Sequence, residues 1–255
     1  MKNVVQFLCV FISVFVFSQA KSVKKLPIKN TTKTAGKKTL TAPKTSDLVI
    51  INKELPVLIP KKKDGNFGYV NQKGKFVIPP QYHIAVFFYE DCNLLNSPNE
   101  KVRKFGTAEY ATVEKDEISY RIDKKGKRVY QFKQSDLAQC APKEYTQQLF
   151  QAYVLNGFYG IIEKSKFKDP KDYKQFQVYP QYDYLYILEG DDVVNPMIIA
   201  SKNDAFGVID VNNNIIIPFE YSDIKRNFSW KLGRMFDVSK DGKDYYYIDS
   251  KNKTY

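Results

Sequence analysis

The feature that most constrains the fold of this chain is a stretch of sequence that occurs twice. Residues 64–82 read DGNFGYVNQKGKFVIPPQY, and residues 203–221, aligned without a gap, read NDAFGVIDVNNNIIIPFEY. Each copy contains short apolar runs separated by turn residues, which is typical of antiparallel strands. A repeated unit of this kind cannot bury its apolar face alone, so neighbouring units are expected to stack and complete the core.

The first copy predicts a unit of three strands, at Leu55–Pro60, Phe67–Asn71 and Lys75–Pro79. Four further copies follow. The copy at Ala111–Tyr130 is degenerate, and the copy at Ala152–Tyr182 is interrupted by an insertion. The copy at Met197–Tyr221 is nearly complete, and the copy at Phe236–Tyr255 is incomplete. The chain is rich in Tyr (19) and Phe (18), which suit a pleated, half-buried surface. We therefore predict an all-β tandem array of about four to five antiparallel β-meander or hairpin units, curved or solenoid-like, over residues 47–255. A short helical insertion fits Ala141–Gln151, which has a Pro near its start.

The second turn of the unit follows one stereochemical rule in four copies. Its first position holds Asn or Asp and the position three residues later holds Gly or Asn, in the pairs Asn71 and Gly74, Asp123 and Gly126, Asp210 and Asn213, and Asp249 and Asn252. An Asn or Asp side chain caps a turn by accepting a backbone hydrogen bond from two residues on, and Gly and Asn tolerate positive φ. The interrupted copy has Glu163 and Lys166 there and breaks the rule.

Two further features recur and define the repeat. A large ring precedes a glycine at Phe67-Gly68, Tyr159-Gly160 and Phe206-Gly207, and a tyrosine closes the same copies at Tyr82, Tyr182 and Tyr221. A glycine in a strand lets a neighbouring backbone or ring approach closely. The degenerate and incomplete copies have Ser119-Tyr120 and Tyr245-Tyr246 instead, so close approach is expected to be relaxed there. We interpret the closing tyrosines as core anchors between repeats, with ligand stacking as the alternative.

These residues resemble WG repeats, bacterial β-repeats with Trp-Gly, then Tyr-Ile-Asp, a Gly-Lys turn and an Ile-Pro-Pro-x-Tyr exit. The resemblance covers most of residues 50–255, although Phe or Tyr replaces the usual Trp and the chain's own Trp230 lies outside the motif. It implies an array of small antiparallel β units without a general enzymatic activity or shared catalytic residues. The leader and composition look like those of an envelope or secreted protein from a Bacteroidetes-type bacterium.

The N-terminus predicts export. Residues 1–20 contain a Lys, an apolar run from Val4 to Phe17 and small residues, which fits a signal peptide cut after Ala20 or after Ser18. The alternative is an uncleaved membrane anchor. Residues 21–46 are rich in Lys and Thr and poor in apolar side chains, so we predict a disordered basic leader. This leader is either a solvated spacer or a weak contact to an anionic surface.

The net charge of +12 lies mostly in this N-terminal part, since residues 1–46 contain nine Lys and no acid. The predicted folded part is therefore close to neutral, which argues against nucleic acid as a partner. Export also places Cys92 and Cys140 in an oxidising space, where they form either a disulfide or two buried thiols.

The sequence offers few residues for catalysis, and we predict no cofactor and no metal. His83 is the single histidine, no Gly-x-Ser-x-Gly motif is present, and His83 is best explained as a residue at the rim of a repeat. The acidic stretch Glu189–Asp192 would suit a glycosidase pair or calcium, but an acidic loop in solvent explains it as well. The Asp and Asn residues of 249–253 are explained by the repeat turn.

We therefore expect a non-enzymatic protein, periplasmic or extracellular, that binds an unidentified protein or glycan through an aromatic-bearing surface. One alternative is a hydrolase of envelope polysaccharide that uses two converging carboxylates. The other is a peripheral membrane adaptor held by its basic leader.

Overall fold

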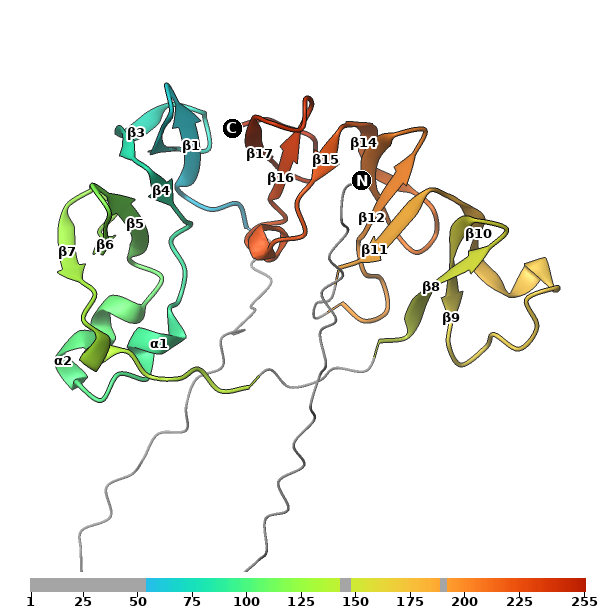
Figure 1. The fold of residues 1–255 in the computed structure, drawn as a ribbon, viewed down its shortest axis with the longest axis horizontal. Coiled ribbons are helices and arrows are strands. Elements are labelled where there is room, and N and C mark those ends of the chain that lie inside the picture. Colours follow the sequence, from blue (N-terminus) through green and yellow to red (C-terminus); the bar gives the residue numbers. More distant parts are fainter. Residues whose placement is uncertain (1–53, 143–147, 189–191) are drawn as a thin grey trace, which may run out of the picture. The chain divides into compact units, whose positions relative to one another are not determined.

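The computed structural model describes residues 54–142, 148–188 and 192–255. The predicted signal peptide, the predicted leader, residues 47–53 of the predicted repeat domain and residues 189–191 of the acidic stretch lie outside the described residues. The described chain is all-β, with seventeen strands in five antiparallel sheets (Figure 1). The predicted fold class is therefore confirmed.

We name the sheets I to V in chain order. Sheet I contains β1 (Ile59–Lys63), β2 (Asn66–Val70) and β3 (Phe76–Tyr82). Sheet II contains β4 (Ile84–Ala85), β5 (Ala111–Lys115), β6 (Ile118–Ile122) and β7 (Arg128–Gln131). Sheet III contains β8 (Phe150–Leu155), β9 (Phe158–Glu163) and β10 (Phe176–Tyr182). Sheet IV contains β11 (Tyr184–Ile187), β12 (Ile198–Lys202), β13 (Ala205–Ile209) and β14 (Ile215–Tyr221), and sheet V contains β15 (Asp223–Ile224), β16 (Phe236–Ser239) and β17 (Tyr245–Ile248).

Short helices lie in the connections between strands. They are α1 (Cys92–Leu95), α2 (Glu100–Arg103) and the 3-10 helices η1 (Lys104–Gly106), η2 (Gln134–Asp136), η3 (Tyr173–Gln175) and η4 (Phe228–Lys231). The helical insertion thus lies mainly in the connection after β4. Of the stretch expected to form a helix at Ala141–Gln151, residues 143–147 are outside the described residues, and Phe150 and Gln151 belong to β8.

At three places, a continuous stretch of chain forms the last strand of one sheet and then the first strand of the next. We call each of these stretches an exit segment. β3 is the last strand of sheet I, and the chain runs directly on into β4, which pairs with β5 in sheet II. β10 and β11 lead in the same way from sheet III to sheet IV, and β14 and β15 lead from sheet IV to sheet V. Each exit segment therefore supplies backbone hydrogen bonds to two sheets, which ties neighbouring units together.

Four apolar clusters fill the junctions between sheets. Three lie between consecutive sheets, namely I and II, III and IV, and IV and V. The fourth lies between sheets V and I, where Ile59 and Val70 pack with Met235 and Tyr255. β1 and β17 lie side by side at this junction (Figure 1). Packing neighbours therefore follow the order III, IV, V, I, II, so the first and last sheets in the chain are neighbours.

Candidate functional site

The repeated glycines lie where the third strand of a sheet bulges against the second. A Cβ added to Gly68, Gly160 or Gly207 would lie 2.5, 2.6 or 2.7 Å from a backbone carbonyl oxygen of that third strand. The pairing shows the same bulge each time: Phe67 pairs with Tyr82, whereas Tyr69 already pairs with Ile78. A side chain at the glycine would force the strands apart, so close backbone approach is the physical reason for the glycine.

The second turn has the geometry that its sequence rule requires. Asp210 Oδ1 accepts hydrogen bonds from the backbone N–H of Asn212 at 2.8 Å and of Asn214 at 2.9 Å. Asn71, Asp123 and Asp249 make the corresponding pair of bonds in their own copies. The residues three positions on, Gly74, Gly126, Asn213 and Asn252, all have positive φ.

The closing tyrosines are buried and bond to the next sheet. Tyr182 Oη donates to Asn213 Oδ1 at 2.7 Å, and Tyr221 Oη donates to Asn252 Oδ1 at 2.5 Å. Tyr82 Oη donates to the carbonyl oxygen of Gly126 at 3.4 Å. Each acceptor is the positive-φ turn residue of the following unit. The three rings are at most 4% exposed, so they are placed as anchors between units and not on a ligand-facing surface.

The aromatic residues beside the glycines lead to a more accessible surface. Tyr159 of sheet III and Phe206 of sheet IV lie on either side of Tyr184, with ring centroids 6.4 and 6.1 Å from that of Tyr184. Arg226, which follows β15, lies 5.2 Å from the Tyr184 ring centroid and 5.5 Å from that of Tyr186. We call Tyr159, Tyr184, Tyr186, Phe206 and Arg226 the aromatic face.

The aromatic face combines partly exposed rings with an available cation. Tyr186 is 38% exposed, and Tyr159, Tyr184 and Phe206 are half-buried. Arg226 is exposed and makes no ion pair with any carboxylate in the described part of the chain. Burial raises the pKa of Tyr184, and Arg226 offsets part of this rise, so the phenol is neutral near neutral pH and can donate a hydrogen bond. The face therefore offers stacking surface, a hydroxyl and a guanidinium.

The sequence alone did not predict Tyr184, Tyr186 and Arg226 as members of this face. A signal for the two tyrosines was present, because they alternate with Leu185, and alternate residues of a strand point to one side. Leu185 is buried and the tyrosines are not. No comparable pattern in the sequence pointed to Arg226, because its contacts with the Tyr184 and Tyr186 rings of sheet IV form only in the folded chain.

A cavity of about 240 Å³ lies between β1 and β17. Its lining residues are Pro60, Lys61, Lys62, Phe67, Ala85, Lys225, Asp237, Tyr245, Tyr246, Tyr247 and Tyr255. Asp237 is the single carboxylate in this lining, and its pKa is raised by burial although Lys225 Nζ lies 3.3 Å from Asp237 Oδ2. The pair of converging carboxylates that a glycosidase needs is therefore not formed by the described residues lining this cavity.

Other candidate groups for chemistry are dispersed. His83 is exposed, and its backbone N–H bonds to the carbonyl oxygen of Glu114. No cluster of three or more His, Cys, Asp or Glu residues within the described ranges could hold a metal ion. Asp192, the described member of the acidic stretch, accepts a hydrogen bond from the backbone N–H of Asn195 at 2.7 Å. None of the helices described is long and apolar enough to span a membrane.

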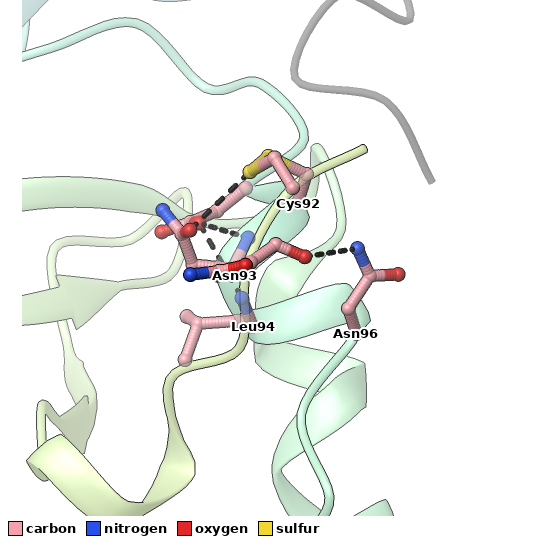
Figure 2. Close-up of a disulfide and its surroundings, with 7 residues drawn as sticks. Cys92, Asn93, Leu94 and Asn96 are labelled. Carbon is pink, nitrogen blue, oxygen red and sulfur yellow. Dashed lines mark hydrogen bonds between the residues drawn. A yellow bond between two sulfur atoms is a disulfide. The ribbon is translucent and has the colours of Figure 1, made fainter. Parts of the chain in front are cut away.

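Cys92 lies in the connection between β4 and β5 of sheet II, and Cys140 lies in the segment after β7. Cys92, at the start of α1, is disulfide-bonded to Cys140 in the segment after β7, with the Cα atoms 5.4 Å apart (Figure 2). Asn96 Nδ2 donates to the carbonyl oxygen of Gln139 at 3.1 Å, and Asp91 caps α1 by accepting from the N–H of Asn93 and Leu94. The disulfide thus fastens the segment leaving sheet II to α1.

Sheet II also contains a buried arginine at a position that is apolar in sheets III and IV. Arg121 pairs with Thr112 as Val208 pairs with Ile199, and its side chain is fully buried. The guanidinium donates to Thr112 Oγ1 and to four backbone carbonyl oxygens of the connection between β4 and β5, those of Tyr89, Phe105, Thr107 and Tyr110. Burial lowers the Arg121 pKa, and the nearby Asp91 opposes this effect.

The comparisons with known proteins identify the repeat. The pattern described as WG containing repeat matches residues 67–92 and 206–243. No curated protein matches the sequence. A solved structure entitled "Crystal structure of the eukaryotic initiation factor" is similar at 12% identity and a TM-score of 0.26, over 79% of this chain and 52% of that chain. This chain thus spans about half of that structure, and the TM-score is too low to indicate a shared fold.

Both matched regions begin at the aromatic residue of the ring-glycine pair and include the bulged third strand and its closing tyrosine. The match and the three-strand geometry thus describe the same unit. The chain thus contains WG-type repeats at residues 67–92 and 206–243, with Phe at the position where the repeat usually has Trp.

Proposed function

We propose that this protein is a non-enzymatic binding module that acts outside the cytoplasm and takes a protein or glycan ligand on its aromatic face. The observation that carries the proposal is the packing of Arg226 over Tyr184 and Tyr186. The guanidinium holds both rings in place before a ligand arrives, which lowers the entropy lost on binding. Tyr and Arg are also the residues that dominate many binding surfaces.

The chemistry of the face suits two classes of ligand. A sugar ring stacks its C–H face on a tyrosine ring, and the Arg226 guanidinium binds a carboxylate or hydroxyl of the same sugar. A protein loop with an apolar and an acidic side chain would make the same contacts. Both ligand classes satisfy one arrangement of rings and cation, so the experiment must distinguish them.

The assignment as a non-enzyme is part of the proposal. Among the described residues, the cavity between β1 and β17 has one carboxylate and the aromatic face has none, so neither presents the pair of carboxylates that a glycosidase uses. Export is likewise proposed, from the apolar run of residues 4–17 and the small residues that follow it.

The test compares binding by the exported full chain with binding by two triple variants. The first carries Tyr184→Ala, Tyr186→Ala and Arg226→Ala. The control carries Tyr173→Ala, Tyr179→Ala and Lys174→Ala, which remove two more exposed tyrosines and a cation from sheet III and η3. Each protein is applied to a glycan array and to immobilised envelope proteins.

We expect the first variant to lose binding by about tenfold to a hundredfold, because one or two strong contacts are removed. The control is expected to bind as the unmodified chain does. Equal binding by all three proteins would reject the aromatic face as the site. Release of reducing sugar from an envelope polysaccharide by the unmodified chain would reject the non-enzymatic assignment.

A further inference from the structure

The cavity between β1 and β17 is lined differently from the aromatic face. Five of the eleven described residues that line it carry rings, namely Phe67, Tyr245, Tyr246, Tyr247 and Tyr255. Three lysines line it as well, against a single aspartate, so the described lining is net positive. No residue of the aromatic face is among them, so the cavity is a separate candidate site.

One of these lysines, Lys61, occupies a position that is apolar or aromatic in the other four sheets. Lys61 pairs with Gly68, the glycine of the ring-glycine pair. The residues that pair at the same position in sheets II to V are Val113, Tyr153, Ala200 and Val238. The three aliphatic ones are 0% exposed and pack in the clusters between sheets. This position therefore directs its side chain at the neighbouring sheet, and in sheet I it directs an ammonium group into the cavity.

The Lys61 ammonium has no counter-charge within the described part of the chain. Neither Lys61 nor Lys62 makes an ion pair with a described carboxylate. Asp237, the aspartate of the lining, is already paired, because Lys225 Nζ lies 3.3 Å from its Oδ2 and Asn227 Nδ2 donates to the same oxygen at 3.1 Å. A cation that faces a partly enclosed space without a partner favours an anionic group there.

The aromatic walls of the cavity are held in place by bonds within the protein. Tyr245 Oη donates to Asp223 Oδ2 at 2.6 Å, and Lys225 Nζ lies 3.7 Å from the Tyr245 ring centroid. Tyr255 Oη donates to Asp249 Oδ2 at 2.9 Å. Rings fixed in this way lose little entropy when a ligand packs against them. Aromatic side chains also offer a large contact area to a flat apolar ring.

The size of the cavity limits the ligand to one ring. An apolar cavity of about 150 Å³ holds benzene, so a cavity of about 240 Å³ has room for one ring with a short substituent. We infer that this cavity binds a small aromatic carboxylate. The ring of the ligand packs among the tyrosines of β17, and its carboxylate binds the Lys61 ammonium, with Lys62 supplying a second positive charge. This is a second site, with a ligand class different from the protein or glycan proposed for the aromatic face.

A fluorine NMR titration of the full chain tests this inference. The probes are para-fluorophenylacetate and para-fluorophenylacetamide, which share the ring and differ in the charge of the substituent. We expect the carboxylate to bind with a dissociation constant of about 0.1–1 mM, as suits a ligand of this size, and the neutral amide to bind about tenfold more weakly.

Two lysine variants locate the charge that the carboxylate needs. Lys61→Met replaces the ammonium by an apolar side chain, of the kind the other sheets have at this position, so an unchanged or higher urea midpoint is expected. Lys61→Met should weaken binding of the carboxylate about tenfold and leave binding of the amide unchanged. Lys243→Met is the matched control, since Lys243 is exposed and does not line the cavity. It should leave binding of both probes unchanged.

The aromatic-face variant separates the two sites. The protein with Tyr184→Ala, Tyr186→Ala and Arg226→Ala should bind the carboxylate as the unmodified chain does, whatever its binding to glycans and envelope proteins. Loss of carboxylate binding in this variant would place the probe on the aromatic face and overturn the inference. Equal affinity of the unmodified chain for the two probes would overturn it as well. So would equal effects of Lys61→Met and Lys243→Met, or no binding of the carboxylate at about 10 mM.

Discussion

Sheets II and IV are two copies of one unit that reach a folded core by different means. In sheet IV, Gly207 admits the bulged third strand and Val208 packs into an apolar cluster. In sheet II, Tyr120 takes the place of the glycine, Arg121 takes the place of the valine, and Tyr120 pairs with Gln131 without the bulge seen opposite Gly207. The hairpin and its Asp-capped turn are the same in both.

The comparison shows that a degenerate copy of the repeat keeps its capped turn even where its core residues have changed. Arg121 is tolerated because the connection between β4 and β5 surrounds it with carbonyl oxygens, and the Cys92–Cys140 disulfide holds that connection to the segment after β7. At the position of Arg121, sheet II thus has a hydrogen-bonded cation in place of an apolar side chain, and a covalent link holds the surrounding connection. In sheet IV, the equivalent residue Val208 packs in an apolar cluster instead.

The largest effect is expected from removing the buried cation. Arg121→Met would leave four backbone carbonyl oxygens and a threonine hydroxyl without their donor, which we expect to cost about 4 kcal/mol in the free energy of unfolding. Val208→Ala, at the equivalent position of sheet IV, should cost about 2 kcal/mol because it only removes apolar contacts. Urea denaturation near neutral pH measures both. A smaller loss in the free energy of unfolding for Arg121→Met than for Val208→Ala would contradict the proposed difference between sheets II and IV.

The next effect concerns the covalent link of sheet II. Replacing Cys92 and Cys140 by serine is expected to lower the free energy of unfolding by about 3 kcal/mol, because the bond closes a loop with a sequence separation of 48 residues. Hydrogen exchange should rise in α1 and α2 and stay unchanged in β12 and β13. A reducing agent should reproduce this pattern in the unmodified chain and have no effect on the double variant. Uniform acceleration across all sheets would show that the bond does not act locally.

The third prediction concerns the glycine that makes room for the bulged third strand in sheet IV and that sheet II lacks. Gly207→Ala is expected to cost about 2 kcal/mol, because its Cβ would lie 2.7 Å from the carbonyl oxygen of Ile217. Gly157→Ala is the control, since that Cβ would meet no atom within 4 Å and the cost of about 1 kcal/mol arises only from its positive φ. Thermal or urea unfolding gives both values. Similar losses in the two variants would mean that the bulge relaxes around the added methyl group.

The smallest effect concerns the closing tyrosines and alkaline pH. Burial raises the pKa of Tyr82 to about 12 and also raises that of Tyr221, above the value of about 10 in an unfolded chain. A raised tyrosine pKa favours the neutral form in the folded protein. The stability it contributes is therefore complete below about pH 10 and is lost as the pH rises through about 12.

Tyr221→Phe should cost about 1 kcal/mol near neutral pH, for the lost bond to Asn252, and should reduce the loss of stability at alkaline pH. Urea midpoints at about pH 7, 9 and 11, with phenolate absorbance followed in parallel, measure this prediction. Tyr173→Phe is the control, because Tyr173 is 64% exposed. A midpoint that is constant through alkaline pH would contradict the burial of these hydroxyls.

Much of the fold could be predicted from local sequence because local chemistry fixes hairpins. The Asp210–Asn213 turn and its equivalents form bonds within five residues, so no distant partner is needed to form them. The close approach at Gly207 was also predictable, since a glycine between apolar residues of a strand usually marks a bulge or a close backbone contact. The aromatic face was harder to predict, because Tyr184 lies in β11 and Arg226 follows β15, and the two meet only when sheets IV and V pack.

By itself the sequence determined the repeated three-strand unit, its capped turns and the tyrosines that close it, since each depends on neighbouring residues and on the stereochemistry of Gly, Asn, Asp and Pro. Tertiary structure alone decided that Arg121 is buried among carbonyl oxygens, that Arg226 lies over two tyrosines and that the last sheet packs against the first. These features join residues far apart along the chain, and the energy that selects them comes from burying surface between units.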